Sequence, residues 1–309
     1  MWGRVIPFFL DLPSTPSSPL HEEGNRTTYN ILLHSQRGHG RSTLPLATEG
    51  QERLTTIPLL ASDIAHLLSA LNISTPVQSV IGVSQGGAAA LAFSAMYGAK
   101  TRSIVSCDTA PRTPAGNKEA WEDRIRLVFG SAEGADAERD AYAYARYMGM
   151  HKLAGVTVPR WFPEGSLCHP DPTANGGREL HSSSNRIPNW VKGMIEETDP
   201  DGFLHGARAL GSYDLLELAQ DEHQMKRLYD SQVEKVLLLA GTLDGGGKVF
   251  VGLRALSEDW NRTLGAGSNH DPSSLSRVTF VGLEKAGHLP MIDSSEAFCE
   301  AVAQFFNSM

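Results

Sequence analysis

The chain has 309 residues, of which 41% are hydrophobic and 20% are charged, and its formal net charge is −8. This composition is ordinary for globular proteins, and the length allows one large α/β domain or two small domains. The acidic balance gives no electrostatic footprint for binding nucleic acid or an anionic membrane surface, and no apolar run is long enough to cross a bilayer.

The number and spacing of the cysteines indicate the redox environment of the protein. The three cysteines, Cys107, Cys168 and Cys299, are an odd number without close spacing. They indicate neither a disulfide framework nor a zinc cluster, and they favour a reducing, cytoplasmic location. We expect a small-molecule ligand and no metal, while the oligomeric state, including a homo-oligomer, stays open.

Strands alternate with helices through most of the sequence. Residues 1–10 are expected to form a short helix, and the Pro- and Ser-rich residues 12–27 a loop. Hydrophobic periodicity predicts strands at 29–34, 77–83, 103–107, 235–240 and 278–281 and helices at 57–71, 86–97 and 295–306. Such alternation predicts a mostly parallel sheet with helices on both faces.

The middle of the chain has a different pattern. Amphipathic helices and polar loops without a convincing strand fill residues 115–225, and residues 163–188 are rich in loop-forming types. We therefore predict one α/β core made of residues 1–114 and 230–309, with residues 115–229 as a helical cap insertion. The cap would lie over the carboxyl ends of the strands, where open α/β sheets bind ligands.

The candidate nucleophile is Ser84, in the sequence Gly82-Val83-Ser84-Gln85-Gly86 between an expected strand and an expected helix. The G-x-S-x-G pattern at such a junction places a serine on a strained turn, with glycines where a Cβ would collide with the neighbouring strand and helix. The N–H of Gln85 at the helix N-terminus can stabilise a developing oxyanion. A glycine-rich turn of this kind can also be purely structural.

His288 is the candidate base. A serine hydroxyl needs a base to take its proton, and the base needs a third group that orients it. His288 follows the last expected strand, in the chain order typical of this motif, and Gly287 lets the loop return over the sheet edge. His270 and His169 lie in expected loops without comparable neighbours, so position favours His288.

Two acids compete for the third role. Asp244 follows the apolar strand at 235–240 and can accept the imidazole Nδ1 proton, or it can simply cap a turn before a glycine. Asp108 also follows an expected strand, two places away in the expected sheet. The order Ser84, Asp244, His288 along the chain favours Asp244.

Together these residues resemble an α/β-hydrolase of the 3-oxoadipate enol-lactonase branch over nearly the whole length. The turn at 37–42, the Ser84 turn, Asp244 and Gly287-His288 are general to the superfamily. Motifs more specific to the branch are Asp108-Thr109-Ala110, Trp121-Glu122-Asp123-Arg124-Ile125, Arg160-Trp161-Phe162, Gly202-Phe203, Ala209-Leu210 and Tyr213-Asp214-Leu215. The resemblance implies an α/β-hydrolase fold.

The resemblance also implies an activity. Members of the branch open the lactone ring of a small substrate derived from a dicarboxylate in aromatic catabolism, without a cofactor. By this resemblance Ser84 would attack the lactone carbonyl, His288 would move the proton, and Asp244 would orient His288. The fold alone suits esterases, thioesterases and peptidases equally.

Four cap residues are implied to surround the substrate. They are Trp121, Arg124, Arg160 and Trp161. An arginine can pair with a substrate carboxylate, which suits a substrate of this class. From the residues alone, a solvated helix face with packing aromatics explains these four equally well.

The sequence departs from the family pattern at its start. In the family a loop after the third strand supplies a second oxyanion N–H, whereas residues 1–10 resemble the helix that follows this loop. We therefore expect the first strands and the loop to be absent, through a truncated gene model or in a genuine short form. Losing one oxyanion donor costs about 10²–10³ in kcat. A second hypothesis is thus a catalytically impaired protein of this fold that binds a ligand or a partner.

A second departure lies between Asp244 and His288. This segment is longer than expected, and residues 265–276 are rich in Gly, Ser, Asn and Pro. We expect them to form an added surface loop.

Overall fold

The computed structural model describes residues 1–10, 29–45, 54–130, 137–170, 183–216, 232–266 and 277–309. The expected loop at 12–27, nearly all of the expected loop at 265–276, and His270 lie outside the described residues. No helix in the part of the chain that the structure describes has the length and hydropathy that a bilayer-spanning segment needs.

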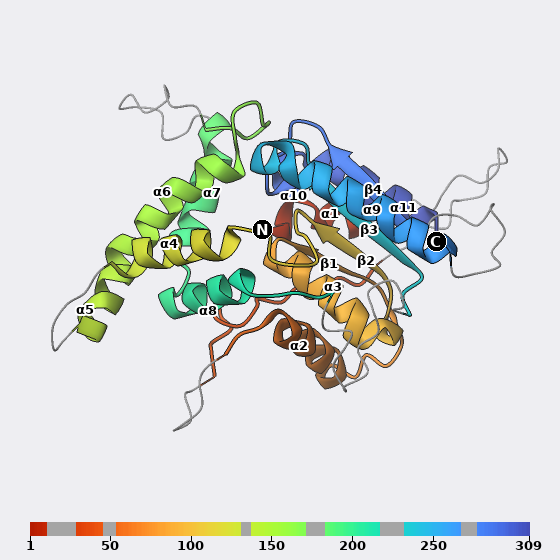
Figure 1. Cartoon of the computed structure of the whole chain (residues 1–309), viewed down its shortest axis with the longest axis horizontal. Helices are drawn as coiled ribbons and strands as arrows, with labels where there is room; N and C mark the ends of the chain where they lie inside the picture. The colour runs from red at the N-terminus through yellow and green to blue at the C-terminus, as the bar shows by residue number, and fades with distance from the viewer. Residues whose placement is uncertain (11–28, 46–53, 131–136, 171–182, 217–231, 267–276) are drawn as a thin grey trace.

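A parallel sheet of four strands forms the centre of the molecule (Figure 1). The strands lie in the order β1-β2-β3-β4, and every neighbouring pair is parallel. Their bounds are Val77–Val83 for β1, Thr101–Cys107 for β2, Lys235–Gly241 for β3 and Val278–Leu283 for β4. Four of the expected strands are confirmed, and their carboxyl ends meet at one edge of the sheet.

The strand expected at 29–34 is wrong, because these residues form no strand in the structure. Leu32 and Leu33 are 47% and 54% exposed. A strand needs a hydrogen-bonded neighbour as well as β-forming residues. Within the described sheet, β1 is an edge strand that pairs only with β2. Residues 29–34 thus have the apolar composition of a strand, but they pair with none of the described strands.

Helices cover both faces of the sheet, as the alternation predicts. On one face α2 (Ile57–Ala70), α3 (Gln85–Tyr97) and α9 (Lys248–Ala266) pack on side chains such as Ile104, Val236 and Leu238. On the other face α1 (Ile6–Leu10), α10 (Pro290–Asp293) and α11 (Ser295–Asn307) cover Val105 and Leu237. Alternate residues of the central strands β2 and β3 face opposite helical layers, which explains their nearly continuous burial.

Local sequence features mark the starts of α2 and α3. Thr56 caps α2 by accepting the Leu59 N–H at 3.2 Å, and Pro58 stands in its first turn. In α3 the small residues Ala88, Ala89 and Ala90 are almost fully buried. They let the helix approach the sheet closely just after Ser84.

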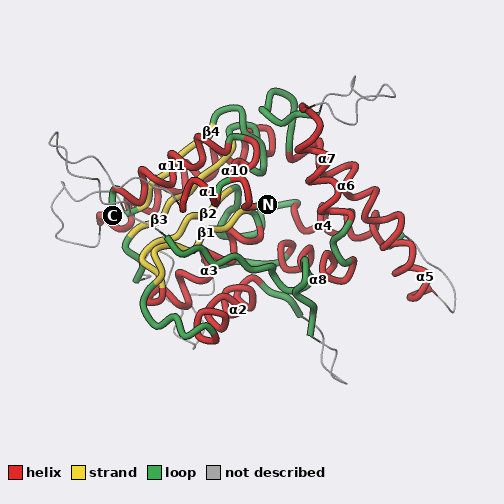
Figure 2. Tube along the Cα trace, turned by 180° about the vertical axis from the view of Figure 1, so that it is seen from behind, coloured by secondary structure: helices red, strands yellow, loops and turns green. Residues whose placement is uncertain are grey.

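Five helices lie together to one side of the sheet, on the left in Figure 1 and on the right in Figure 2. Their bounds are Asn117–Phe129 for α4, Ala137–Tyr144 for α5, Met150–Trp161 for α6, Ser183–Glu196 for α7 and Pro200–Gly211 for α8. Between 115 and 216 the described residues form helices and loops, with only an isolated bridge that joins Arg112 and Asp214. The helical content agrees with the sequence, while the division into core and cap stays a prediction.

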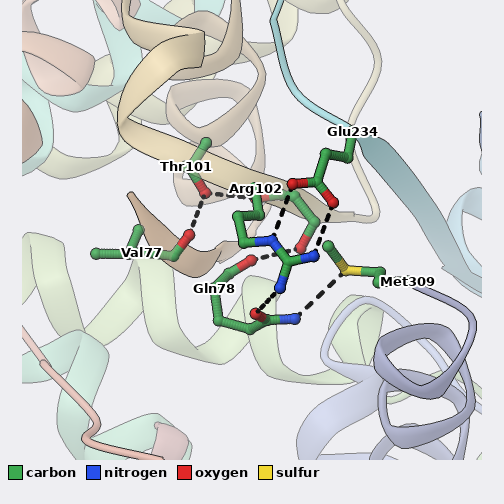
Figure 3. A network of polar contacts seen from close by, with 7 residues as sticks. Val77, Gln78, Thr101, Arg102, Glu234 and Met309 are labelled. Carbon is green, nitrogen blue, oxygen red and sulfur yellow. Dashed lines mark hydrogen bonds and ion pairs between the residues drawn. The ribbon is translucent and has the colours of Figure 1, made fainter. Parts of the chain in front are cut away.

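A polar network ties the amino ends of three strands together (Figure 3). Arg102 of β2 donates to both carboxylate oxygens of Glu234, just before β3, at 2.9 Å each. It also donates to the Gln78 side chain of β1 at 3.2 Å, and Gln78 donates in turn to the sulfur of Met309 at 3.4 Å. The network fixes the amino ends of these parallel strands, opposite the edge where their carboxyl ends meet.

Candidate active site

Ser84 lies at the junction of β1 and α3 with a strained backbone. Its φ is 55° and its ψ is −119°, a conformation that a residue with a side chain rarely adopts. The Ser84 N–H donates to the Cys107 carbonyl at 2.9 Å, and its carbonyl accepts from Ala88 at 2.9 Å. The neighbouring strand and the following helix therefore hold the turn in place.

The glycines of the turn differ in how much room a Cβ would have. A Cβ on Gly82 would lie 2.0 Å from the Gly86 carbonyl oxygen, so the expected collision is real there. A Cβ on Gly86 would meet only the Gln36 amide nitrogen at 3.7 Å, an ordinary contact, so the collision expected at this position is wrong. The tight second position is Gly87, where a Cβ would lie 2.7 Å from a methyl carbon of Thr109.

His288 and Asp244 contact each other from two neighbouring loops. The imidazole Nδ1 lies 2.8 Å from Asp244 Oδ2, and the side chains are 16% and 8% exposed. Asp244 opens a short turn just after β3, and His288 follows β4, which pairs with β3. The sheet thus brings together two residues that are far apart in the sequence.

The loop that carries His288 is fixed by backbone contacts. The His288 N–H donates to the Trp161 carbonyl at 3.0 Å. Asp293 accepts the N–H groups of Gly287 and Cys168, both at 2.7 Å, through separate oxygens. Burial raises the pKa of Asp293, and the two backbone N–H groups oppose that shift. Sequence reasoning missed Asp293, because nothing in its local sequence marks it as a tertiary anchor.

Asp108 lies next to Asp244 and not two strands away, because β2 pairs directly with β3. Its Oδ1 accepts the Gly241 N–H at 3.0 Å, and the whole residue is 4% exposed. Burial, and then the charge of Asp244, raise the pKa of Asp108 well above its usual value. Asp244, and not Asp108, is the acid that the structure places against the His288 ring.

The pKa of Asp244 moves the other way. Burial on its own would raise it, but the charge and hydrogen bond of His288, a hydrogen bond with Asp108 and the charge of Arg160 together lower it. The lowered pKa of Asp244 and the raised pKa of Asp108 favour Asp244 as the ionised member of the two acids, beside the His288 imidazole.

A cavity of about 220 Å³ is lined by Ser84, Gln85 and His288. Its wall is mostly apolar, and half of its lining residues come from α6, α7 and α8, including Met150, Val191 and Leu210. The volume lies below the roughly 300–1,000 Å³ usual for drug-sized ligands, so the cavity suits a small molecule.

All four cap residues singled out from the sequence line this cavity. The guanidinium of Arg124 lies over the Trp121 ring, 4.6 Å from its centroid, and the buried Trp121 Nε1 has no hydrogen-bond partner among the described residues. Arg160 is exposed as a whole residue, although desolvation lowers the pKa of its guanidinium. Trp161 stacks on the His288 ring, with centroids 5.6 Å apart.

The charges of the cavity wall are of one sign. Among the described residues that line it, Arg124 and Arg160 carry charge and none is an Asp or a Glu. A small cavity with two guanidinium groups at its wall favours an anionic ligand.

The turn at 37–42 has a place in the site that sequence reasoning did not assign. Gln36 and His39 line the cavity beside Ser84. Arg37 holds the turn by donating to Asp63 of α2 at 2.7 Å, and His39 Nδ1 lies 3.1 Å from the Arg37 carbonyl. The glycine-punctuated sequence marks a turn, but its position beside the serine depends on the packing against α2.

His169, another histidine considered from the sequence, does not line the cavity. His169 Nδ1 lies 2.9 Å from the Phe162 carbonyl, so that ring is held by a backbone contact. Within the described ranges, no group of three or more His, Cys, Asp or Glu side chains could hold a metal ion.

Comparison with known proteins gives the context of this geometry. A family described as "Alpha/beta hydrolase family" matches residues 2–301. No curated protein matches the chain. Three solved structures of similar shape are a malate-bound esterase from Thermogutta terrifontis, the enol-lactonase from Burkholderia xenovorans LB400 and a homoserine O-acetyltransferase from Bacillus anthracis.

The likeness to these structures is one of fold. For the esterase the TM-score is 0.58 at 22% identity, over 88% of this chain and 78% of that one. For the enol-lactonase the TM-score is 0.56 at 23% identity, over 87% of this chain and 78% of that one. For the acetyltransferase the TM-score is 0.57 at 15% identity, over 82% of this chain and 66% of that one. Because one neighbour is a transferase, the shared fold leaves the reaction open.

Proposed function

Because the chain belongs to the alpha/beta hydrolase family, we propose that it is a cofactor-independent serine hydrolase that cleaves a lactone or a carboxylic ester. One observation carries the proposal. The strained Ser84 lines the same small cavity as His288, and His288 contacts Asp244 through its Nδ1. A nucleophile, a base and a group that orients the base are what acyl transfer by serine requires.

Each group has a role in this reaction. Ser84 Oγ attacks the carbonyl carbon, and His288 Nε2 accepts the proton, while Asp244 holds the Nδ1 proton and stabilises the imidazolium. The Gln85 N–H, at the start of α3, donates to the oxyanion. Collapse of the tetrahedral intermediate expels the alkoxide, which takes the proton from His288. Water activated by His288 then hydrolyses the acyl-serine.

The cavity supports a small anionic substrate. Two arginine side chains, Arg124 and Arg160, are among its described lining residues, and either can pair with a carboxylate. A lactone that bears a carboxylate combines the required size, charge and electrophilic carbonyl. The fold likeness to an enol-lactonase and to an esterase with malate bound agrees with this substrate class.

The test is hydrolysis of two probes, a γ-lactone that bears a carboxylate and the neutral ester para-nitrophenyl acetate. We expect the wild type to turn over both, and Ser84→Ala to lose at least about 10³-fold in kcat on both. Activity that survives in Ser84→Ala would overturn the proposal. Thermal stabilisation by the intact lactone without turnover would instead favour the ligand-binding alternative.

A further inference from the structure

Two buried carboxyl groups follow neighbouring strands, and one of them contacts the His288 ring. Asp108 follows β2, Asp244 follows the adjacent β3, and the residues are 4% and 6% exposed. The backbone fixes Asp108, because its N–H donates to the Leu239 carbonyl at 2.9 Å and its φ is 48°. A strained backbone at a buried acid beside the reacting groups points to a function for that side chain.

The oxygens of the two groups can be accounted for one by one. Asp244 Oδ2 contacts His288 Nδ1, and Asp108 Oδ1 accepts the Gly241 N–H. Asp108 Oδ2 is fully buried and has no donor among the described residues. Asp108 and Asp244 follow directly paired strands, and each side chain affects the pKa of the other. Two ionised carboxylates offer only acceptors, so a hydrogen bond between these two side chains needs one proton.

The charges around the pair decide which acid holds the proton. Asp244 faces the imidazole of His288 and also feels the guanidinium of Arg160, and both favour its ionised form. Asp108 is surrounded by the sheet, beside the buried Cys107 thiol and the negative Asp244. A proton on Asp108 Oδ2 turns the unpartnered oxygen into a donor and removes the repulsion between the two carboxylates.

We propose, resting on the proposed hydrolase function, that Asp108 is a positioning residue whose neutral carboxyl group donates a hydrogen bond to the Asp244 carboxylate. Its other oxygen is anchored on Gly241, so the donor is held rigidly. Asp244 is then fixed from two sides, by Asp108 and by His288. The arrangement orients the acid without adding a second negative charge beside the base.

Two variants separate a neutral donor from an ionised acid. Asp108→Asn keeps an acceptor for Gly241 and an N–H donor for Asp244, whereas Asp108→Leu has similar shape and neither group. With para-nitrophenyl acetate we expect Asp108→Asn to stay within about threefold of the wild type in kcat. We expect Asp108→Leu to lose about tenfold to hundredfold in kcat with little change in KM, because a buried acceptor is left unpaired.

The pH profile of kcat/KM separates a neutral Asp108 from an ionised one, which a loss of structural support alone would not do. Because the Asn variant keeps both hydrogen bonds and the net charge of the pair, its acidic limb should coincide with that of the wild type. If Asp108 were ionised, the Asn variant would remove a negative charge beside His288 and displace that limb to lower pH. Such a displacement, or a loss in Asp108→Asn as large as in Asp108→Leu, would overturn the inference.

Thermal unfolding tests the inference without relying on activity. An acid whose pKa is raised in the folded state supports the fold fully at low pH, and this support is lost as the pH rises through the folded value. The Tm of Asp108→Asn minus that of the wild type should therefore increase from pH 4 to pH 8. A decrease over this range would show an ionised Asp108 and overturn the inference. An active wild type with such a decrease would leave the hydrolase proposal intact.

Discussion

The Trp161 ring stacks on the imidazole of His288, with ring centroids 5.6 Å apart and planes inclined by 27°. The His288 N–H also donates to the Trp161 carbonyl at 3.0 Å. Trp161 ends α6 among the helices beside the sheet, whereas His288 follows β4. The helices that form most of the cavity wall are therefore joined directly to the histidine, and a change in one should affect the other.

Loss of the stacked ring should lower activity without unfolding the protein. An aromatic pair of this kind contributes about 0.5–1.5 kcal/mol beyond its buried area, so Trp161→Ala should lower kcat/KM about two- to tenfold on a neutral ester. Trp161→Phe should retain most of it. The control is Trp190→Ala on α7, because that side chain is 42% exposed and does not line the cavity. An equal loss in both alanine variants would contradict a specific role for the stack.

Gly287 should not tolerate a side chain. An added Cβ would lie 2.2 Å from the Trp161 carbonyl oxygen, so the loop that carries His288 would have to move. We expect Gly287→Ala to lower the free energy of unfolding by about 1–3 kcal/mol, as overpacking does, and to lower kcat as well. Gly155→Ala within α6 is the matched control, because a Cβ there meets no atom within 4 Å. Denaturant unfolding that ranks the two variants equally would contradict this packing.

The arginines of the cavity wall should matter for charged substrates only. Removing a charged hydrogen-bond partner costs about 1.5–3 kcal/mol, so Arg124→Ala or Arg160→Ala should raise KM for a carboxylated lactone at least about tenfold. KM for para-nitrophenyl acetate should change little. Arg126→Ala is the control on α4, the helix that carries Arg124, because Arg126 is exposed and pairs with Asp123 outside the cavity. Equal effects on both substrates would rule out carboxylate recognition by these residues.

The carboxylate of Asp244 should make stability depend on pH with a definite sign. The pKa of Asp244 is lowered in the folded state. The carboxylate therefore stabilises the fold above its unfolded pKa of about 3.9, and this stabilisation is lost as the pH falls through its folded pKa. The Tm of the wild type minus that of Asp244→Asn should therefore shrink from pH 7 to pH 3. Asp244→Asn should also lose about 10³–10⁴ in kcat at neutral pH. A Tm difference that stays constant over this range would contradict an ionised Asp244.

Local sequence was enough to predict the parts of the molecule whose structure is set nearby. The strand, turn and helix around Ser84 follow from an apolar run, glycines and small residues in succession. The order of Ser84, Asp244 and His288 along the chain also favoured Asp244 as the partner of His288, and the structure brings these two into contact because β3 and β4 are neighbours. The fold class, with an α/β-hydrolase sheet covered on both faces, is confirmed by the family match and the solved structures.

Tertiary placement explains what the sequence could not show. Residues 29–34 have the composition of a strand, but pairing depends on a neighbour that composition does not reveal. The anchoring of Gly287 by Asp293 and the position of Gln36 beside Ser84 depend on packing between distant segments. Asp108 was a rival to Asp244 in the sequence, and only the geometry places Asp244 against His288.

Chemical activation of Ser84 is the central claim, and reaction with a fluorophosphonate tests it without assuming a substrate. Intact mass would be measured for the wild type, Ser84→Ala and Asp244→Asn after exposure to the probe. We predict one equivalent of label on the wild type, none on Ser84→Ala and much slower labelling of Asp244→Asn. A folded wild type that stays unlabelled, or label that persists in Ser84→Ala, would contradict the account.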